Sequence, residues 1–205
     1  MEEGKEYGKI PKKAAVWEET TFGSWILEDG VLEDQTFLEC EFHRCQFLTS
    51  QIRRCLFRSC KFYNCVFVGN EWDFSSMISG GFYSCVCVGI NWEQLRTKTR
   101  ANETVGEAQN TFFKYCSFFQ MNLNKFHFET CRFQESYFEE CRLRESCFEQ
   151  VEFDKTQFRS CDLRKADFRG AVNYVMDPTQ NRMQDARFSF PEVIHLLDGL
   201  GIRIE

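Results

Sequence analysis

Residues 35–69 read QTFLE-CEFHR-CQFLT-SQIRR-CLFRS-CKFYN-CVFVG, with one large apolar residue in the middle of every group of five. Outward from this stretch, the same spacing runs from Phe22 to Trp92 and resumes, shifted by one residue, from Phe113 to Phe168. A second column lies two residues before each large one and is mostly small. It holds ten of the twelve cysteines, all except Cys87 and Cys147.

A period of five matches neither the 3.6 residues of a helical turn nor the alternation of a simple strand. It is typical of a chain that turns a corner every five residues. Within each group the small and the large residue, two apart, point to the same side, as in a short strand. The other three positions are mostly polar. The pattern therefore predicts a narrow solenoid with ladders of large residues inside.

Composition sets the outer limits. The chain has 205 residues, 23 phenylalanines, three prolines and a formal charge of −6. Disorder is excluded, because this much apolar surface offsets the ordering entropy. We find no stretch long enough for a membrane span and no signal peptide at the start. We expect a cytoplasmic protein with reduced thiols and no direct nucleic-acid binding, since nucleic-acid binders usually carry a basic face.

The units CRFQE (131–135), CRLRE (141–145), CDLRK (161–165) and ADFRG (166–170) resemble the pentapeptide-repeat family, whose pattern is small–Asp/Asn–Leu/Phe–X–X. The resemblance implies an all-β fold, a right-handed quadrilateral β-helix with four units per coil, and about seven coils here. We divide the chain into an N-terminal segment (1–19), a first block of coils (20–94), an interruption (95–110), a second block (111–173) and a C-terminal cap (174–205).

The interruption reads LRTKTRANETVGEAQN and holds almost no large apolar residue. Insertions in solenoids often form loops on a binding face. An irregular coil, made of three weak units and one bulged residue, is the alternative. As a partner-binding loop it would present the charged residues Arg96, Lys98, Arg100, Glu103 and Glu107.

The C-terminal tail predicts an α-helix, with Ser189 as a cap and Pro191 in the first turn. The helix would cover the last open coil, as solenoids require. This tail also resembles the end of the quinolone-resistance (Qnr-type) and microcin-immunity proteins. That resemblance implies a head-to-head homodimer through Val193, Leu196, Leu197 and Leu200.

Catalytic chemistry is not predicted. The three histidines have no partner at triad or metal spacing, and the cysteines recur five apart, unlike zinc-binding pairs. We therefore predict no enzyme, no metal and no cofactor, and interpret the cysteines as small buried hydrophobes. Cys147 is the exception. It precedes Phe148 and should point outward as the most reactive thiol.

One wall of the predicted solenoid is unusually apolar on its outside. With four units per coil, the wall of Leu27, Phe47, Phe67 and Cys87 has these outward residues: Leu48, Val66, Val68, Val86 and Val88. An exposed patch of this kind marks an interface or is covered by another part of the chain. β-Branched residues also simply favour strands.

Negative charge is concentrated in the first half. Residues 1–94 carry 14 acidic and nine basic side chains, whereas 111–170 carry ten of each. The acidic surface residues are Glu28, Asp29, Glu33, Asp34, Glu71 and Asp73. The family resemblance implies a DNA mimic that binds DNA gyrase or topoisomerase IV and protects it from a quinolone or a peptide toxin. A generic scaffold that binds another protein through the apolar wall is the alternative function.

Overall fold

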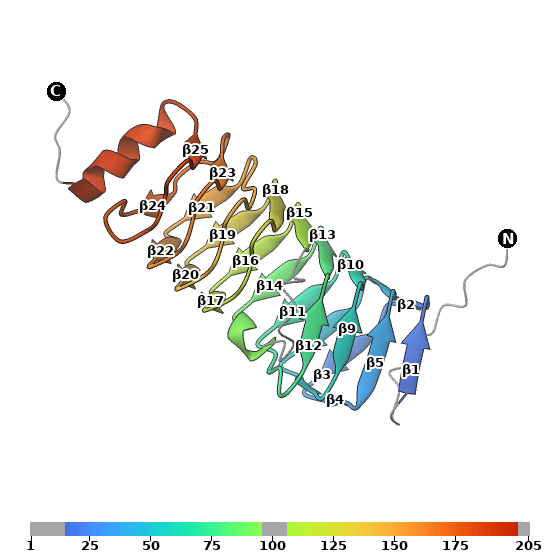
Figure 1. Ribbon diagram of the computed structural model, residues 1–205. Coiled ribbons are helices and arrows are strands. Elements are labelled where there is room, and N and C mark those ends of the chain that lie inside the picture. Colours follow the sequence, from blue (N-terminus) through green and yellow to red (C-terminus); the bar gives the residue numbers. More distant parts are fainter. Residues whose placement is uncertain (1–14, 96–105, 201–205) are drawn as a thin grey trace, which may run out of the picture.

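The computed structural model describes residues 15–95 and 106–200, with the side chains of residues 198 and 199 left aside. The chain winds into a rod of about eight coils, one more than the repeat count predicted, with the N- and C-terminal parts at opposite ends (Figure 1). The extra length arises because Trp17 at one end and Phe188 at the other also pack on the core. The expected quadrilateral β-helix is confirmed.

Strands on the first and second walls are three residues long or shorter and pair in parallel. The first wall contains β2 (Thr21–Gly23), β6 (Glu41–His43), β10 (Lys61–Tyr63), β13 (Gly81–Tyr83), β15 (Glu107–Gln109), β18 (His127–Glu129), β23 (Asp167–Phe168) and β25 (Arg187–Phe188). The second wall contains β3 (Ile26–Glu28), β7 (Gln46–Leu48), β11 (Val66–Val68), β14 (Val86–Val88), β16 (Phe112–Lys114), β19 (Arg132–Gln134) and β21 (Glu152–Asp154).

The third and fourth walls combine short strands with single bridges between coils. The third wall contains β4 (Val31–Glu33), β8 (Gln51–Arg53), the 3₁₀ helix η1 (Trp92–Leu95), β17 (Ser117–Phe119), β20 (Tyr137–Glu139), β22 (Gln157–Arg159) and β24 (Val175–Met176). The fourth wall contains β1 (Ala15–Glu18), β5 (Gln35–Leu38), β9 (Leu56–Arg58) and β12 (Ser76–Ile78). Bridges from Asn122 through Arg142 and Asp162 to Arg182 continue this wall.

Register between coils is 20 residues, as four groups of five require. Thus the Cys45 amide donates to the thiol of Cys65, 20 residues on, but the Cys85 amide donates to Thr111, 26 residues on. The coil at the interruption is therefore six residues longer than the others. Ala108 pairs with Phe82 and points inward, so the second block begins one unit earlier than predicted. The pattern of large residues does not reveal this position, because alanine occupies it.

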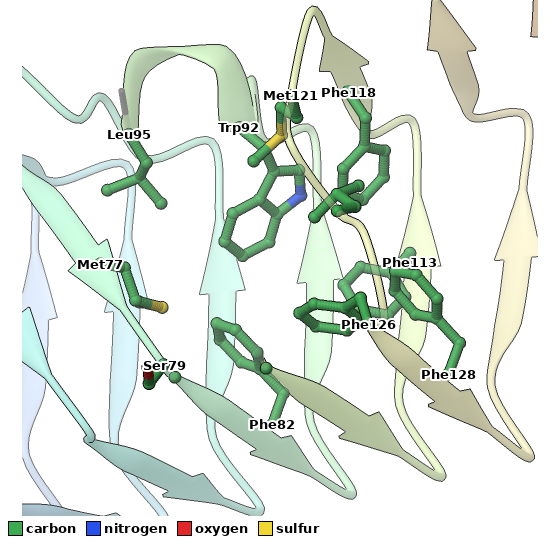
Figure 2. A pocket seen from close by; sticks show the side chains of 13 residues that line it. Met77, Ser79, Phe82, Trp92, Leu95, Phe113, Phe118, Met121, Phe126 and Phe128 are labelled. Carbon is green, nitrogen blue, oxygen red and sulfur yellow. The ribbon is translucent and has the colours of Figure 1, made fainter. Parts of the chain in front are cut away.

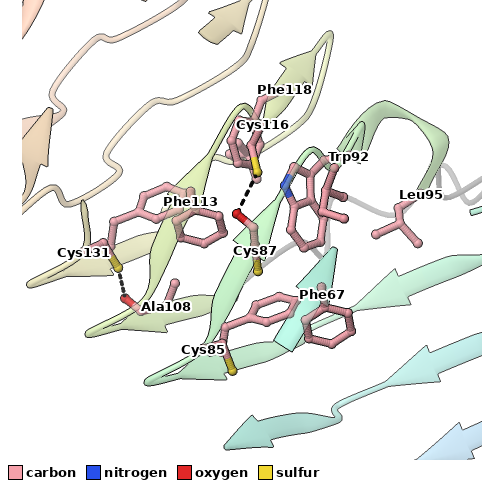
Figure 3. Close-up of a cluster of buried hydrophobic side chains, with 14 of the residues drawn as sticks. Phe67, Cys85, Cys87, Trp92, Leu95, Ala108, Phe113, Cys116, Phe118 and Cys131 are labelled. Carbon is pink, nitrogen blue, oxygen red and sulfur yellow. Dashed lines mark hydrogen bonds between the residues drawn. The ribbon is translucent and has the colours of Figure 1, made fainter. Parts of the chain in front are cut away.

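The core is a set of aromatic stacks that follow the rod axis. Phe113 and Phe133 stack at 4.7 Å between ring centroids, Phe118 and Phe138 at 4.5 Å, and rings on adjacent walls meet edge-on. Figure 3 shows this interior around Trp92 and Phe113. Stacked and edge-on pairs each add about 0.5–1.5 kcal/mol to the burial of the rings.

The small residues that lie two positions before each large inward residue also donate hydrogen bonds. The Cys116 thiol donates to the Cys87 carbonyl at 3.4 Å, and the Cys131 thiol to the Ala108 carbonyl at 3.2 Å (Figure 3). Ser75 and Thr111 make the same bonds with their hydroxyls. This explains why Cys, Ser and Thr are interchangeable at these positions: each is small, and each can donate a hydrogen bond to a buried carbonyl.

Corners between walls place one residue of each unit in the left-handed region, with φ near +50°. Arg44 and Asn64 are examples, and the amides of both donate to a carbonyl in the next coil at 2.9 Å. For a residue with a side chain this conformation costs about 1–2 kcal/mol. The hydrogen bond between coils offsets part of that cost, so most corners do without glycine.

Both ends of the rod differ from expectation. β1 pairs with β5, so the β-helix begins within the segment predicted as 1–19. The C-terminal helix η2 (Glu192–Leu200) is a 3₁₀ helix, not the predicted α-helix. Its Ile194 amide donates to Pro191, three residues back, in a bond typical of such short pieces. A period of three aligns Val193 with Leu196, and Leu196 packs on the core.

Candidate interaction surfaces

The predicted apolar wall lies on the outside of the second wall. Strand pairing brings its five residues together, because β7, β11 and β14 are neighbours in register. The same outer face adds two residues that the prediction missed, Ile26 on β3 and Phe112 on β16. We call this surface the apolar strip: Ile26, Leu48, Val66, Val68, Val86, Val88 and Phe112. Ile26 is 61% exposed and Val86 36%, and the others are half-buried.

Charged residues lie at both ends of the apolar strip. Glu28 is exposed beside Ile26 on β3. At the other end, Lys114 lies over the Tyr115 ring, and Arg132 lies over the Phe112 ring and within 3.6 Å of Glu152. β1 lies on the fourth wall, so Val16 and Trp17 do not cover the strip.

The predicted acidic residues gather on the third wall and its corners. Glu33, Glu71 and Asp73 lie on the wall itself, Asp29 and Asp34 at its two corners, and Glu28 on the adjoining edge of the second wall. Arginines neutralise part of this charge. Arg54 donates to Asp34 at 2.7 and 3.0 Å and lies 2.8 Å from Glu33, and Arg53 lies 3.4 Å from Asp73. The hydrogen bonds from Arg54 lower the pKa of Asp34.

Charges also gather on individual walls, which a count along the chain does not show. Glu93 and Glu139 extend the acidic third wall into later coils. On the fourth wall, Arg144, Arg164 and Arg182 lie within 2.7–3.9 Å of the Asp162 carboxylate, and Arg142 is the bridge partner of Asp162 in the preceding coil. Residues 20 apart share a wall, so three arginines of 111–170 lie together on the fourth wall, whereas the second and third walls carry both signs of charge there. Reading the sequence every 20 residues would have revealed this.

Most of the predicted partner-binding loop, Arg96, Lys98, Arg100 and Glu103, lies outside the described residues. Glu107 is described and is not in a loop. It lies in β15 on the first wall, where the Tyr83 hydroxyl donates to its carboxylate. Tyr83 ends an outward stack with Tyr63 and His43, with ring centroids 4.7–4.8 Å apart. Burial and Glu107 raise the pKa of Tyr83.

A small apolar pocket opens beside the interruption. Its volume is about 90 Å³, and Met77, Phe82, Trp92 and Phe126 point into it (Figure 2). It lies where the fourth-wall ladder passes from Met77 to Leu123. None of the described residues that line it is charged, so its walls offer apolar contact but no acid, base or nucleophile.

The thiols have the environment of structural cysteines. Burial raises the pKa of Cys55 and Cys116 to about 11 and that of Cys131 to about 12, so all three stay protonated. Cys147 lies on the outer face of the first wall, bridged to His127 and Asp167, and is half-buried. Within residues 15–95 and 106–200, no group of three or more His, Cys, Asp or Glu side chains is placed to hold a metal ion.

In the proposed dimer helix, Leu196 contacts the core and Val193 and Leu197 are half-buried. Leu200 is 45% exposed. Leu196 therefore helps to cap this rod, and Leu200 remains available to a partner. No helix among the described residues has the length and hydropathy needed to span a membrane.

Comparison with known proteins agrees with this architecture. Residues 113–150 and 136–172 match the family model of pentapeptide repeats. A trypsin-treated variant of QnrB1, a plasmid-mediated fluoroquinolone resistance protein, superposes with a TM-score of 0.59 at 14% identity, covering 90% of this chain and 100% of that one.

HetL, a pentapeptide repeat protein involved in heterocyst differentiation regulation in the cyanobacterium Nostoc, gives a TM-score of 0.57 at 9% identity, over 88% and 87% of the two chains. No curated protein matches in sequence. The repeats, the four-walled coil and these structures agree: residues 113–172 match pentapeptide repeats, and the chain has the β-helix fold of pentapeptide-repeat proteins.

Proposed function

We propose that this protein is a non-enzymatic DNA mimic that acts in the cytoplasm. It would bind a type II topoisomerase, DNA gyrase or topoisomerase IV, and protect it from a quinolone or a peptide toxin. The observation that carries the proposal is the acidic third wall, which presents Glu33, Glu71, Asp73, Glu93 and Glu139 along one side of a straight rod. Lys and Arg sites that bind DNA phosphates would bind such a wall in the same way.

Charge density decides which part of the rod can act as the mimic. B-DNA carries one charge per roughly 1.7 Å. About eight coils at roughly 4.8 Å make a rod about 40 Å long. A net charge of −6 spread over that length is about one charge per 6–7 Å. The rod as a whole is thus several times less charged than DNA, and the third wall, where the acids gather, supplies the interaction.

The proposed partner contact has two further parts. The interruption would contribute Arg96, Lys98, Arg100 and Glu103, which lie outside the described residues, as charged contacts to the enzyme. The exposed end of η2, with Leu200 and Leu197, would pair two rods end to end and double the length of the acidic wall. QnrB1 supports the topoisomerase proposal only by fold, since the two chains are 14% identical.

The test is a gyrase or topoisomerase IV supercoiling assay with added protein, with and without a fluoroquinolone. We expect micromolar protein to change supercoiling or to restore it in the presence of the drug. The sharper version reverses two charges on the third wall, Glu71→Lys with Asp73→Lys, which should reduce the effect at least tenfold.

The chain offers a matched control for this change. Glu152 and Asp154 on the second wall also have one arginine and one glutamine partner, Arg132 at 3.6 Å and Gln134 at 2.9 Å. For the test pair, Arg53 lies near Asp73 and Gln51 donates to Glu71. Glu152→Lys with Asp154→Lys changes the net charge equally and should keep the effect. Equal losses in both variants would contradict a role for the third wall.

A second candidate function is favoured by the apolar strip. On this alternative the protein is an interaction scaffold whose Val/Leu surface binds an unrelated protein. HetL, with the same fold and a regulatory role, illustrates that the fold does not specify one partner. A protein inactive in every topoisomerase assay, yet disabled in its cellular role by charges placed in the strip, would support this candidate.

A further inference from the structure

The apolar strip has an internal order that goes beyond its hydrophobicity. Two outward columns run along the second wall, one on each side of the inward ladder. From β3 to β16, the first column reads Ile26, Gln46, Val66, Val86, Phe112, and the second reads Glu28, Leu48, Val68, Val88, Lys114. Each column is apolar near its middle, and the second column ends in opposite charges.

At the middle of the strip, the corner that borders the second column carries no side chains. Gly69 and Gly89 follow β11 and β14, where other coils have residues with side chains, such as Thr49 and Tyr115. An added Cβ would meet nothing closer than 3.6 Å at Gly69 and 4.0 Å at Gly89. Packing within the rod therefore does not exclude a side chain there, and its absence leaves the centre of the strip open to a flat surface.

We propose that the apolar strip pairs with the strip of a second copy of this chain, with the two rods side by side and antiparallel. The two-fold axis would run along β11. This rotation places each column of one rod opposite the same column of the other rod, with the coils in reverse order. Val66 and Val68 then meet their own equivalents, Leu48 meets Val88, Ile26 meets Phe112, Gln46 meets Val86, and Glu28 meets Lys114.

Charge complementarity selects this arrangement over the others. If the rods ran parallel, the columns would exchange, so Ile26 would face Glu28, and Glu152 would face Asp154, an acidic pair. If the axis lay between β11 and β14, Ile26 would face Arg132 and Leu48 would face Lys114. If the axis lay along β14, Glu28 would face Asp154. If the axis lay between β7 and β11, Glu28 would face Val88. Among these arrangements, only the axis along β11 places Glu28 on Lys114 and six of the seven strip residues on apolar residues, with Val86 opposite Gln46.

The size of the strip predicts a weak dimer. Five coils at roughly 4.8 Å span about 20 Å, and a three-residue strand spans about 10 Å. Such a face is smaller than the roughly 800 Å² per partner of a stable complex. The pairing should therefore depend on concentration and be seen best by trapping. It uses a different surface from the proposed topoisomerase contact and does not depend on it.

The experiment traps the pair at its two-fold axis. Val68→Cys is introduced into the full chain together with Cys147→Ser, which removes the half-buried native thiol. Facing walls lie about 10 Å apart, too far for a disulfide, so a bismaleimide with a spacer of about 8 Å is used. The matched control is Val31→Cys in the same background, an exposed valine on the third wall. We expect at least fivefold more cross-linked dimer from Val68→Cys than from the control.

A charge exchange tests the orientation. Added to the Val68→Cys variant, Glu28→Lys alone or Lys114→Glu alone should reduce the yield at least threefold, and the two together should restore it. Leu200→Glu should leave the yield unchanged, because η2 takes no part. Equal yields from positions 68 and 31, or failure of the double exchange to restore the yield, would overturn the proposal and leave the strip to another protein. Unchanged circular dichroism checks that each variant is folded.

Discussion

The two halves of the second wall have the same interior and different exteriors. Inside, Phe47 stacks on Phe67 in the first half and Phe113 on Phe133 in the second, with ring centroids 5.0 and 4.7 Å apart. Outside, Val66 and Val86 are replaced across the interruption by residues such as Arg132 and Glu152. The interior positions are constrained by packing, whereas the outward ones are free to differ. Differences between the halves therefore concern partners rather than the fold.

The largest expected effect comes from disrupting the inward aromatic ladder, which both halves share. Phe133 is fully buried and stacks between Phe113 and Phe153, so Phe133→Ala should destabilise the protein by about 3–5 kcal/mol. Denaturant unfolding measures this. Val68→Ala on the outer face should cost less than about 0.5 kcal/mol. A similar cost for both variants would mean that the outer face carries as much of the stability as the ladder.

Thiol labelling compares the inside and the outside directly. A maleimide should label Cys147 roughly a hundred times faster than the buried Cys161, which must wait for local opening. Burial still raises the pKa of Cys147, so at pH 7 its thiolate fraction is small. Its labelling rate should therefore rise about tenfold per pH unit between pH 7 and 8.5. Mass spectrometry of partly labelled protein identifies the residue, and preferential labelling elsewhere would contradict the assignment.

A corner substitution tests the low edge of the apolar strip. Gly69 has φ +58°, so Gly69→Val should cost about 1–2 kcal/mol through the left-handed conformation. Gly69→Asn should cost only a few tenths of a kcal/mol, since Asn occupies the same conformation at Asn64. Thermal unfolding of the two variants is the measurement. Equal losses would show that lack of space, rather than φ, requires glycine.

The smallest effect concerns an ion pair of the second half. Arg169 donates to Asp167 at 2.7–3.1 Å and lowers its pKa below the usual 3.8. The folded state then binds the proton more weakly than the unfolded state, so the pair stabilises the protein above about pH 4. The benefit is lost as the pH falls below that value. Asp167→Asn should cost less than about 1 kcal/mol at pH 7 and progressively less as the pH falls below about 4. A cost that did not change with pH would point to lost packing instead.

Much of the candidate surface was accessible from the repeat alone. Counting four units per coil placed Leu48, Val66, Val68, Val86 and Val88 on one wall, and the strand register confirms it. Phe112 could not be placed from the repeat, because it is separated from Val86 by a coil whose length the sequence does not give.

The period of five by itself determined the solenoid, the inward ladder and the structural role of the cysteines. These depend on residues two to five apart, whose relation is set by the geometry of a short strand and a corner. Tertiary structure alone decided which outward residues meet. Neighbours on a wall are 20 residues apart, or 26 across the interruption, and only the folded coils show where the six additional residues are absorbed. The pairings of Arg54 with Asp34 and of Arg144 with Asp162 join neighbouring coils, because electrostatic interactions follow distance in space, not position in the chain.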